Sequence, residues 1–288
     1  MSERRPETDP RSPPVKIFIS SDMEGTAGVV DWSQCLAGEA QYPYYTELLT
    51  GEINAAIEGA MEAGATEFLV NDSHSKMANL KPDALAGRAG YLSGRYKPMY
   101  MMQGLDEGFD AVFLVSYHGS MGSGGSVLSH TYFPSAFAEI TINGVVAGEA
   151  GINALVARAY QVPIVLVTGD VTTAEETEPF CPGIKTAVVK KSITRFSAEA
   201  LHPEAARELI RERAAAAVRD LADAAPPSID VPVTLGISFR TSDYCELGAR
   251  IAGVERTGDL SAVITGDDPL WIYQTFITVV LLCRGLVE

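Results

Sequence analysis

Acidic and imidazole side chains follow several apolar runs of this chain. Asp22 and Glu24 directly follow the first run, in "FISSDMEGTAG". His74 follows the second, in "FLVNDSHSK", and His118 follows a third, in "VFLVSYHGS". A mixed set of carboxylates and imidazoles is what a divalent transition metal requires. These residue types therefore indicate metal chemistry, provided that the fold brings the segments together.

Each of these residues also has a simpler interpretation. Asp22 or Glu24 can cap a following element, and a single histidine after a strand can be structural. Asp72, in "NDSH", suits a turn former or a hydrogen-bond partner of a histidine. Glu149 stands at the start of a predicted helix, where a negative charge is favourable. On spacing alone, capping and metal binding both remain open, and the zinc motif HExxH is absent.

The other two of the four histidines differ in their settings. His130 follows the glycine-rich "GSMGSGGSVLSH", whose residues 119–126 are either a mobile gate or a plain connector. His202 directly precedes Pro203, and proline is favoured at the first position of a helix. We therefore interpret His202 as a helix-start residue and exclude it from the site.

The elements that must position these residues alternate along the chain. Short, almost continuously apolar runs predict strands covered on both faces, at 15–20, 66–71, 110–116, 163–169 and 231–239. Helical spacing predicts helices at 46–64, 149–161, 202–224 and 268–285. Asn-Gly at 143–144 predicts a hairpin. The order predicts an α/β fold, a three-layer sandwich with a mostly parallel central sheet and a smaller C-terminal α+β portion.

The predicted organisation has three parts. Residues 1–14 form a polar, proline-rich tail that we expect to be disordered. Residues 15–195 form the α/β catalytic domain with the metal site. Residues 196–288 form a helical and strand portion, which we interpret as a subdomain and oligomer interface. In an open α/β sheet, functional side chains gather beyond the carboxyl ends of the strands, where the acids and histidines stand.

Composition narrows the classes of function. The 288 residues carry a formal net charge of −15, which argues against nucleic acid, because phosphate backbones require clustered Lys and Arg. No apolar run reaches the roughly 18 residues of a membrane span, and the N-terminus lacks the apolar core of a signal peptide. Four scattered cysteines without a CxxC pair indicate buried thiols in a reduced compartment. We therefore expect a cytoplasmic protein without a membrane partner.

Five separated segments resemble the DppA-like D-aminopeptidases of the M55 metallopeptidase family. They are "SSDMEGTAGV", "VNDSHSKM", "LVSYHG", "SHT" and "NGVVAGEAGINA", in the order of the family. The similarity runs from about residue 15 to 191 and more weakly to the C-terminus. It implies two Zn²⁺ per subunit and removal of N-terminal D-amino acids from short peptides of the D-Ala-D-Ala type. It also implies a homodecamer of two stacked pentameric rings.

The resemblance assigns a role to each candidate ligand. Asp22 would bridge the two zinc ions. Glu24 and His74 would complete the first site, and His118 and Glu149 would complete the second. Three carboxylates leave one of the four zinc charges unbalanced, and a hydroxide formed from zinc-bound water would supply it and act as the nucleophile. In an extended segment Asp22 and Glu24 point to the same side, so both can reach one centre.

By the same resemblance, His130 is the catalytic histidine beside the metals. Histidine titrates near neutral pH, so His130 can deliver a proton to the leaving amine. Two other functions stay open: a non-catalytic metal- or peptide-binding protein of this fold, and another metal-dependent amidohydrolase. Phosphoryl transfer is disfavoured, because no GxxxxGK[ST] loop occurs.

Overall fold

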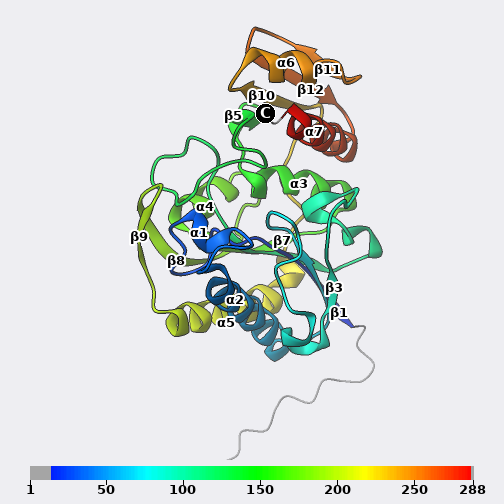
Figure 1. The fold of residues 1–288 in the computed structure, drawn as a ribbon. Coiled ribbons are helices and arrows are strands. Elements are labelled where there is room, and N and C mark those ends of the chain that lie inside the picture. The colour runs from blue at the N-terminus through cyan, green and yellow to red at the C-terminus, as the bar shows by residue number, and fades with distance from the viewer. Residues whose placement is uncertain (1–13, 287–288) are drawn as a thin grey trace, which may run out of the picture.

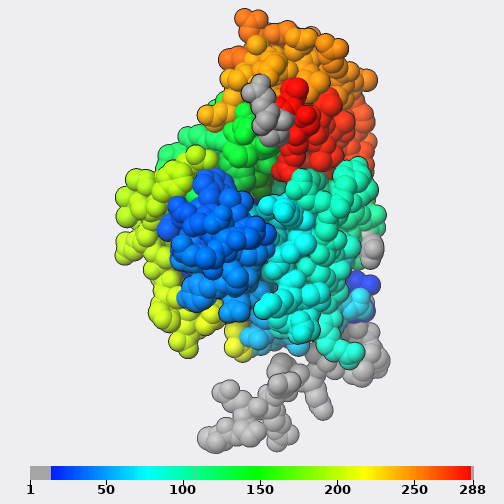
Figure 2. Space-filling view, in the orientation of Figure 1, coloured from blue at the N-terminus to red at the C-terminus, as the bar shows by residue number. Residues whose placement is uncertain are grey.

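The computed structural model describes residues 14–286. Residues 1–13, where most of the predicted disordered tail falls, and residues 287–288 lie outside the described residues. The chain forms two sheets, a larger one between layers of helices and a smaller one at one end of the molecule (Figure 1). In the space-filling view, the C-terminal residues coloured orange and red gather at that end (Figure 2). The fold is mixed α/β with a mostly parallel central sheet and an added antiparallel sheet, which confirms the predicted fold class.

The larger sheet has seven strands in the order β3-β2-β1-β4-β7-β8-β9. Neighbouring strands pair in parallel, except that β8 and β9 pair antiparallel. Every residue of β4 and of β7 is buried, as expected of strands covered on both faces. The strands are β1 Val15–Ser21, β2 Ala65–Asp72, β3 Gly90–Leu92, β4 Ala111–Tyr117, β7 Ile164–Asp170, β8 Lys185–Thr194 and β9 Ser197–Ala200.

Helices cover both faces of this sheet (Figure 1). α2 (Tyr42–Glu62) and α5 (Pro203–Arg219) pack against each other on one face. α3 (Glu149–Tyr160) and α4 (Val171–Thr177) lie on the other. Alternate side chains of β1 enter the two cores, because strand residues point to opposite faces: Ile17 and Ile19 join the α2 and α5 side, and Phe18 joins the α3 side. Between β1 and α2 stands the short helix α1 (Trp32–Cys35).

The smaller sheet is antiparallel, in the order β11-β12-β10-β5-β6. β5 (Phe137–Ile142) and β6 (Val145–Val146) form the hairpin predicted at Asn143 and Gly144, whose positive φ values suit a tight turn. The remaining strands come from the last third of the chain: β10 Val233–Phe239, β11 Val254–Arg256 and β12 Ser261–Gly266. α6 (Ser242–Gly248) and α7 (Pro269–Cys283) pack on this sheet.

One described helical segment is long and apolar enough to cross a membrane, although the composition suggested none. Pro269–Leu286 spans 18 residues with a mean hydropathy of 1.4, and 44% of that window is buried. Tyr273, Phe276 and Val280 are fully buried, and α7 packs against α3 and β12. This packing explains the apolar composition as that of a helix in the core.

The four cysteines are free and buried, which confirms the prediction for the thiols.

Candidate metal centre

The carboxyl ends of three neighbouring strands meet at the middle of the larger sheet. β1 lies between β2 and β4. From β1 the chain first adds β2 and β3 on one side of the sheet and then β4 on the other side, so the strand order reverses at β1. Ligands bind at such a point in open α/β sheets. The structure brings all six predicted site residues together here, with Glu149 supplied by the first turn of α3: Asp22, Glu24, His74, His118, His130 and Glu149.

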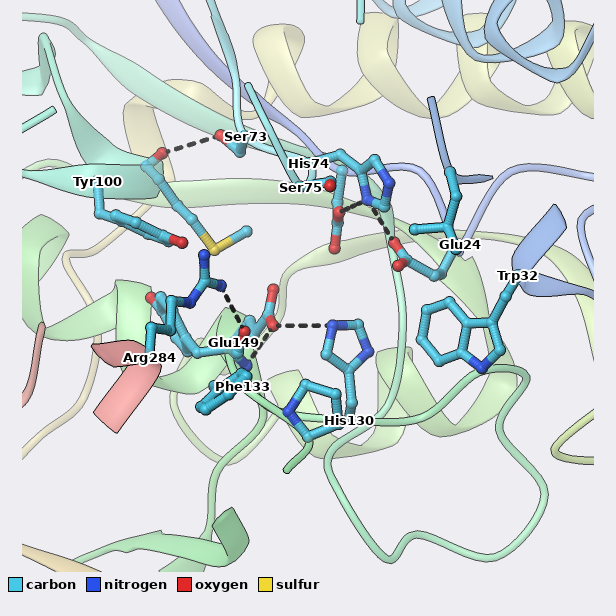
Figure 3. Close-up of a pocket in the computed structure, with 15 residues that line it drawn as sticks. Glu24, Trp32, Ser73, His74, Ser75, Tyr100, His130, Phe133, Glu149 and Arg284 are labelled. Atoms are coloured by element: carbon cyan, nitrogen blue, oxygen red, sulfur yellow. Dashed lines mark hydrogen bonds and ion pairs between the residues drawn. The ribbon is translucent and has the colours of Figure 1, made fainter. Parts of the chain in front are cut away.

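The first donor group surrounds His74. Its Nδ1 lies 3.2 Å from Asp22 Oδ1 and 3.0 Å from Glu24 Oε2 (Figure 3). On the other side of the ring, Nε2 donates to the carbonyl oxygen of Cys35 at 2.9 Å. That bond places one proton on Nε2, so Nδ1 faces the acids and offers its lone pair to a cation once its own proton is lost. A carbonyl partner behind the imidazole is typical of a histidine that binds metal.

The second donor group surrounds His118. Its Nε2 lies 3.2 Å from Asp22 Oδ2 and 3.8 Å from Glu149 Oε2. Its Nδ1 donates to the carbonyl oxygen of Gly119 at 2.9 Å, so Nε2 faces the acids and offers its lone pair to a cation once its own proton is lost. Both Asp22 Oδ2 and His118 Nε2 are buried without a well-formed hydrogen bond. Buried polar atoms of this kind require a partner, and a cation between the two would satisfy them.

The two groups share one residue. Asp22, Glu24 and His74 have ligand atoms within 4.8 Å of one another, and so do Asp22, His118 and Glu149. Each carboxylate oxygen of Asp22 faces a different histidine. Zinc prefers nitrogen and carboxylate oxygen donors of this type. The donor set therefore fits two cations with Asp22 between them.

The buried charges are balanced by protons in the absence of metal. Burial tends to raise the pKa of Asp22, but His118 and His74 lower it well below its usual value. Burial raises the pKa of Glu149 to about 8. Burial opposes a charge on both histidines, but the neighbouring carboxylates raise the pKa of His118 to about 10 and that of His74 well above its usual value. The resulting protons offset the charges of Asp22 and Glu24.

His130 stacks on His118, with ring centroids 4.2 Å apart and planes 12° from parallel. Its Nδ1 donates to the carbonyl oxygen of Leu128, and its Nε2 lies 3.7 Å from Glu149 Oε1 (Figure 3). Burial and the charge of His118 lower the pKa of His130 to about 4, so its imidazole is neutral at neutral pH. Its ligand atom also lies within 4.8 Å of those of Glu24 and His118. The geometry thus permits a proton carrier or a further ligand.

Asp72 organises the loop that carries His74. Its carboxylate accepts hydrogen bonds from the backbone and the side chain of Asn79 and from the backbone of Leu80. Asn79 in turn donates to the carbonyl oxygen of His74 at 2.8 Å. The turn-former interpretation of Asp72 is therefore confirmed. The alternative is wrong, because the carbonyl of Cys35 is the partner of the His74 ring instead.

Two buried lysines hold the loops that carry the candidate ligands. Lys190, on β8, is 2% exposed, and its Nζ donates to three backbone carbonyl oxygens of the loop after β1, those of Glu24, Thr26 and Val29. Lys97 donates to the carbonyl oxygen of Asp72 at 2.6 Å, at the end of β2. Burial lowers the pKa of each lysine to about 8.

Gly25 allows the loop after β1 to lie against the end of β4. Its N–H donates to the carbonyl oxygen of Ser116 at 2.8 Å. A Cβ at Gly25 would overlap the carbonyl oxygen of Tyr117, the residue before His118. This close approach brings the acids of one loop to the histidine of the next strand.

The metal centre opens into a cavity of about 330 Å³ (Figure 3). The described residues of 119–126 do not line this cavity, so the gating role stays a hypothesis. His202 lies elsewhere, where its ring accepts from the Glu204 N–H at the start of α5, as predicted. Several wall residues were not identified from the sequence: Trp32, Leu36, Tyr100, Met101, Tyr132, Phe133, Pro134 and Arg284.

The chain is similar to known peptidases over almost its whole length. The model of the M55 peptidase family, described as D-aminopeptidase, matches residues 15–278. A D-aminopeptidase of Bacillus subtilis (strain 168) is 34% identical over 264 residues, which cover 91% of this chain and 96% of the relative. A solved structure described as the Zn-dependent D-aminopeptidase DppA from Bacillus subtilis, a self-compartmentalizing protease, has a TM-score of 0.89 and 33% identity. The match covers 95% of this chain and all of that one, and so includes both sheets.

Proposed function

The chain belongs to the M55 family of D-aminopeptidases, and from this premise we propose that it removes N-terminal D-amino acids from short peptides at a centre of two zinc ions. It is a hydrolase that acts on peptide bonds, and its relative of known structure is zinc-dependent. The number of zinc ions, the role of each residue and the substrate are our proposals.

The observation that carries the proposal is the position of Asp22 between two histidines. Asp22 would be shared by both ions, with Glu24 and His74 on one side and His118 and Glu149 on the other. Bound zinc would lower the pKa of water toward about 7 and polarise the scissile carbonyl. Buried hydrogen bonds orient the rings of His74 and His118, hold the loop that carries Asp22 and Glu24, and link Glu149 to the Tyr132 N–H.

His130 is proposed as the residue that moves the proton. Its neutral imidazole presents Nε2 to the cavity, beside Glu149. A neutral imidazole can accept a proton from the attacking water and pass it to the leaving amine. The Nδ1 bond to Leu128 fixes the ring orientation for both transfers.

The size of the cavity supports a small substrate. About 330 Å³ is near the lower end of the roughly 300–1,000 Å³ typical of ligand pockets. A cavity of this volume suits a dipeptide of the D-Ala-D-Ala type. The name of the relatives supports the D configuration. A hydrolysis panel tests this directly, with D-Ala-D-Ala, L-Ala-L-Ala and the two mixed isomers as substrates.

The panel is run on the purified enzyme, after chelation, and after zinc is restored. We expect cleavage of D-Ala-D-Ala that chelation abolishes and zinc restores. Binding of D-Ala-D-Ala without cleavage would favour the non-catalytic alternative. Cleavage that persists after complete metal removal would contradict the zinc mechanism.

A His130→Ala variant separates the two roles that the geometry allows. We expect two zinc ions per chain by elemental analysis and a loss of turnover of about 10²–10⁴-fold, the usual contribution of general acid–base catalysis. A variant that loses zinc would place His130 among the ligands instead.

We also propose that the protein is a homo-oligomer, specifically a decamer. The description of the solved relative as self-compartmentalizing supports this. Light scattering tests it, since a decamer has ten times the 30.7 kDa mass of the chain. A cytoplasmic location stays a prediction.

A further inference from the structure

Arg284 reaches the cavity from a different part of the fold than the metal ligands. It directly follows α7, in the C-terminal part of the chain, yet it lines the same cavity as Asp22 and Glu149. Figure 3 shows its side chain beside Glu149 and Tyr100. A half-buried cation therefore stands at the edge of a site whose other charged walls are carboxylates and imidazoles.

The guanidinium of Arg284 contacts two aromatic rings, and some of its N–H donors remain available to a ligand. It lies 5.7 Å from the ring centroid of Tyr100 and 5.7 Å from that of Phe133, as in cation–π contacts. One Nη donates to the carbonyl oxygen of Tyr132 at 2.8 Å. Its Nε is buried and has no hydrogen-bond partner. A guanidinium carries five N–H donors, so this one retains capacity for a ligand.

The chemistry of those donors selects the ligand. Arginine matches a carboxylate bidentately, through two parallel N–H···O bonds. Among residues 14–286, Arg284 forms no ion pair, because no carboxylate oxygen lies within 4.0 Å of its guanidinium nitrogens. A carboxylate brought by the substrate would accept from the remaining guanidinium N–H groups and balance the charge. In a short peptide, that group is the C-terminus.

We propose that Arg284 binds the C-terminal carboxylate of the peptide substrate and so selects peptides with a free C-terminus. The inference rests on the proposed aminopeptidase function. The small cavity places both groups within one short ligand, with the scissile bond at the metals and the carboxylate at Arg284. Amino-terminal residues are thus cleaved from peptides short enough for the enzyme to contact both ends.

The test compares two substrates that differ only at the C-terminus, D-Ala-D-Ala and its C-terminal amide. For the wild-type enzyme we expect a higher kcat/KM for the free acid. For Arg284→Met we expect kcat/KM for the acid to fall about 10–100-fold, and that for the amide to change little. The loss corresponds to about 1.4–2.8 kcal/mol of binding. Zinc content should stay at the wild-type value.

Arg158→Met is the matched control. Arg158 is also half-buried and donates to a backbone carbonyl, that of Ile229, but it does not line this cavity. We expect it to leave both substrates unaffected. Arg284→Lys keeps the charge without the bidentate geometry and should give an intermediate preference. It also provides the test if Arg284→Met fails to fold.

The rival role is structural, because Tyr132 accepts from Arg284 and donates its own N–H to Glu149 at 2.7 Å. If Arg284 only positions Glu149, both substrates lose the same factor, and the proposal is overturned. Equal wild-type rates for acid and amide overturn it as well. If the wild-type enzyme cleaves neither substrate, the proposed function fails rather than this inference alone.

Discussion

The cavity has two ends that are held in different ways. At the end with the proposed metal site, here called the metal end, Asp22 is 3% exposed and Glu24 is 1% exposed, and their loop is hydrogen-bonded to Lys190 and to β4. At the other end, Arg284 is half-buried and follows the last long helix, with one hydrogen bond and two aromatic contacts. Adjacent parallel strands position the first end, and the smaller sheet with its helix positions the second.

The two ends meet two different requirements of an enzyme, a fixed geometry for metal ligands and recognition of the substrate. Ligands of a metal must hold their geometry before the substrate arrives, and buried backbone hydrogen bonds provide that stability. A group that recognises a variable part of the substrate tolerates a looser support. Substitutions of the proposed metal ligands should therefore change zinc and turnover together, whereas substitutions at the Arg284 end should change selectivity alone.

The largest effect should come from Asp22→Asn. The amide is neutral and has only one oxygen, so it cannot serve two cations. We expect both zinc ions to be lost and kcat/KM for D-Ala-D-Ala to fall at least about 10³-fold, or about 4 kcal/mol. Elemental analysis and steady-state kinetics measure this. Asp83→Asn, an exposed aspartate, is the control. A variant that retains two zinc ions would rule out the bridging role.

Lys190→Met should destabilise the loop that carries Asp22 and Glu24 without replacing a proposed ligand. It removes the lysine donor from three buried carbonyl oxygens, of which that of Thr26 still accepts from the Val29 N–H. We expect the free energy of unfolding to fall by about 2–4 kcal/mol, since a single unsatisfied group costs about 1–3 kcal/mol. Urea denaturation measures the change, and competition with a chelator measures zinc affinity. Lys191→Met is the control, because the next residue along β8 is exposed. If both variants had the same free energy of unfolding, Lys190 would not stabilise the loop after β1.

Zinc uptake by the chelated enzyme should release protons. At neutral pH both His118 and Glu149 are protonated in the absence of metal, since their pKa values are about 10 and about 8. Metal must displace these protons, so the apparent affinity should rise with pH, about tenfold per unit for each proton displaced. Titration calorimetry in buffers of different ionisation enthalpy counts the protons. An affinity that stays constant between pH 6 and 8 would refute this.

The smallest effect should come from Phe133→Leu at the other end. A cation–π contact contributes about 0.5–1 kcal/mol, so kcat/KM for the free acid should fall about two- to fivefold. The amide and the zinc content should not change. Kinetics with both substrates measure the difference. Loss of zinc in this variant would show that the two ends are not independent.

The sequence predicts that the candidate ligands converge at one edge of the sheet, because its signals are local. Apolar runs define β1, β2 and β4, and ligand-type residues follow each run directly. Parallel strands share one carboxyl edge, so separate segments converge without any knowledge of strand order. Position alone therefore singles out His74 and His118 as candidates, and the family resemblance adds the metal assignment and the proposed distinction between bridging and terminal ligands.

The remaining features depend on contacts between distant segments. β5 pairs with β10, where Ile142 faces Leu235, and nothing local to the hairpin indicates that partner. Arg284 ends an apolar helix, where a cation already suits the helix dipole, so the local pattern gives no reason to expect a ligand-binding role. Lys190 and Lys191 are adjacent and chemically identical, and only the packing shows which one is buried.

The order in which the chain is synthesised bears on how the enzyme acquires its metal. Asp22 leaves the ribosome early, but its partners follow far later: His118 after β4, Glu149 at α3, and the supporting Lys190 only on β8. The donor set is complete only when these distant strands have paired, and non-local pairing is slow. Zinc bound at this donor set would therefore be captured by a nearly finished fold rather than by a nascent chain.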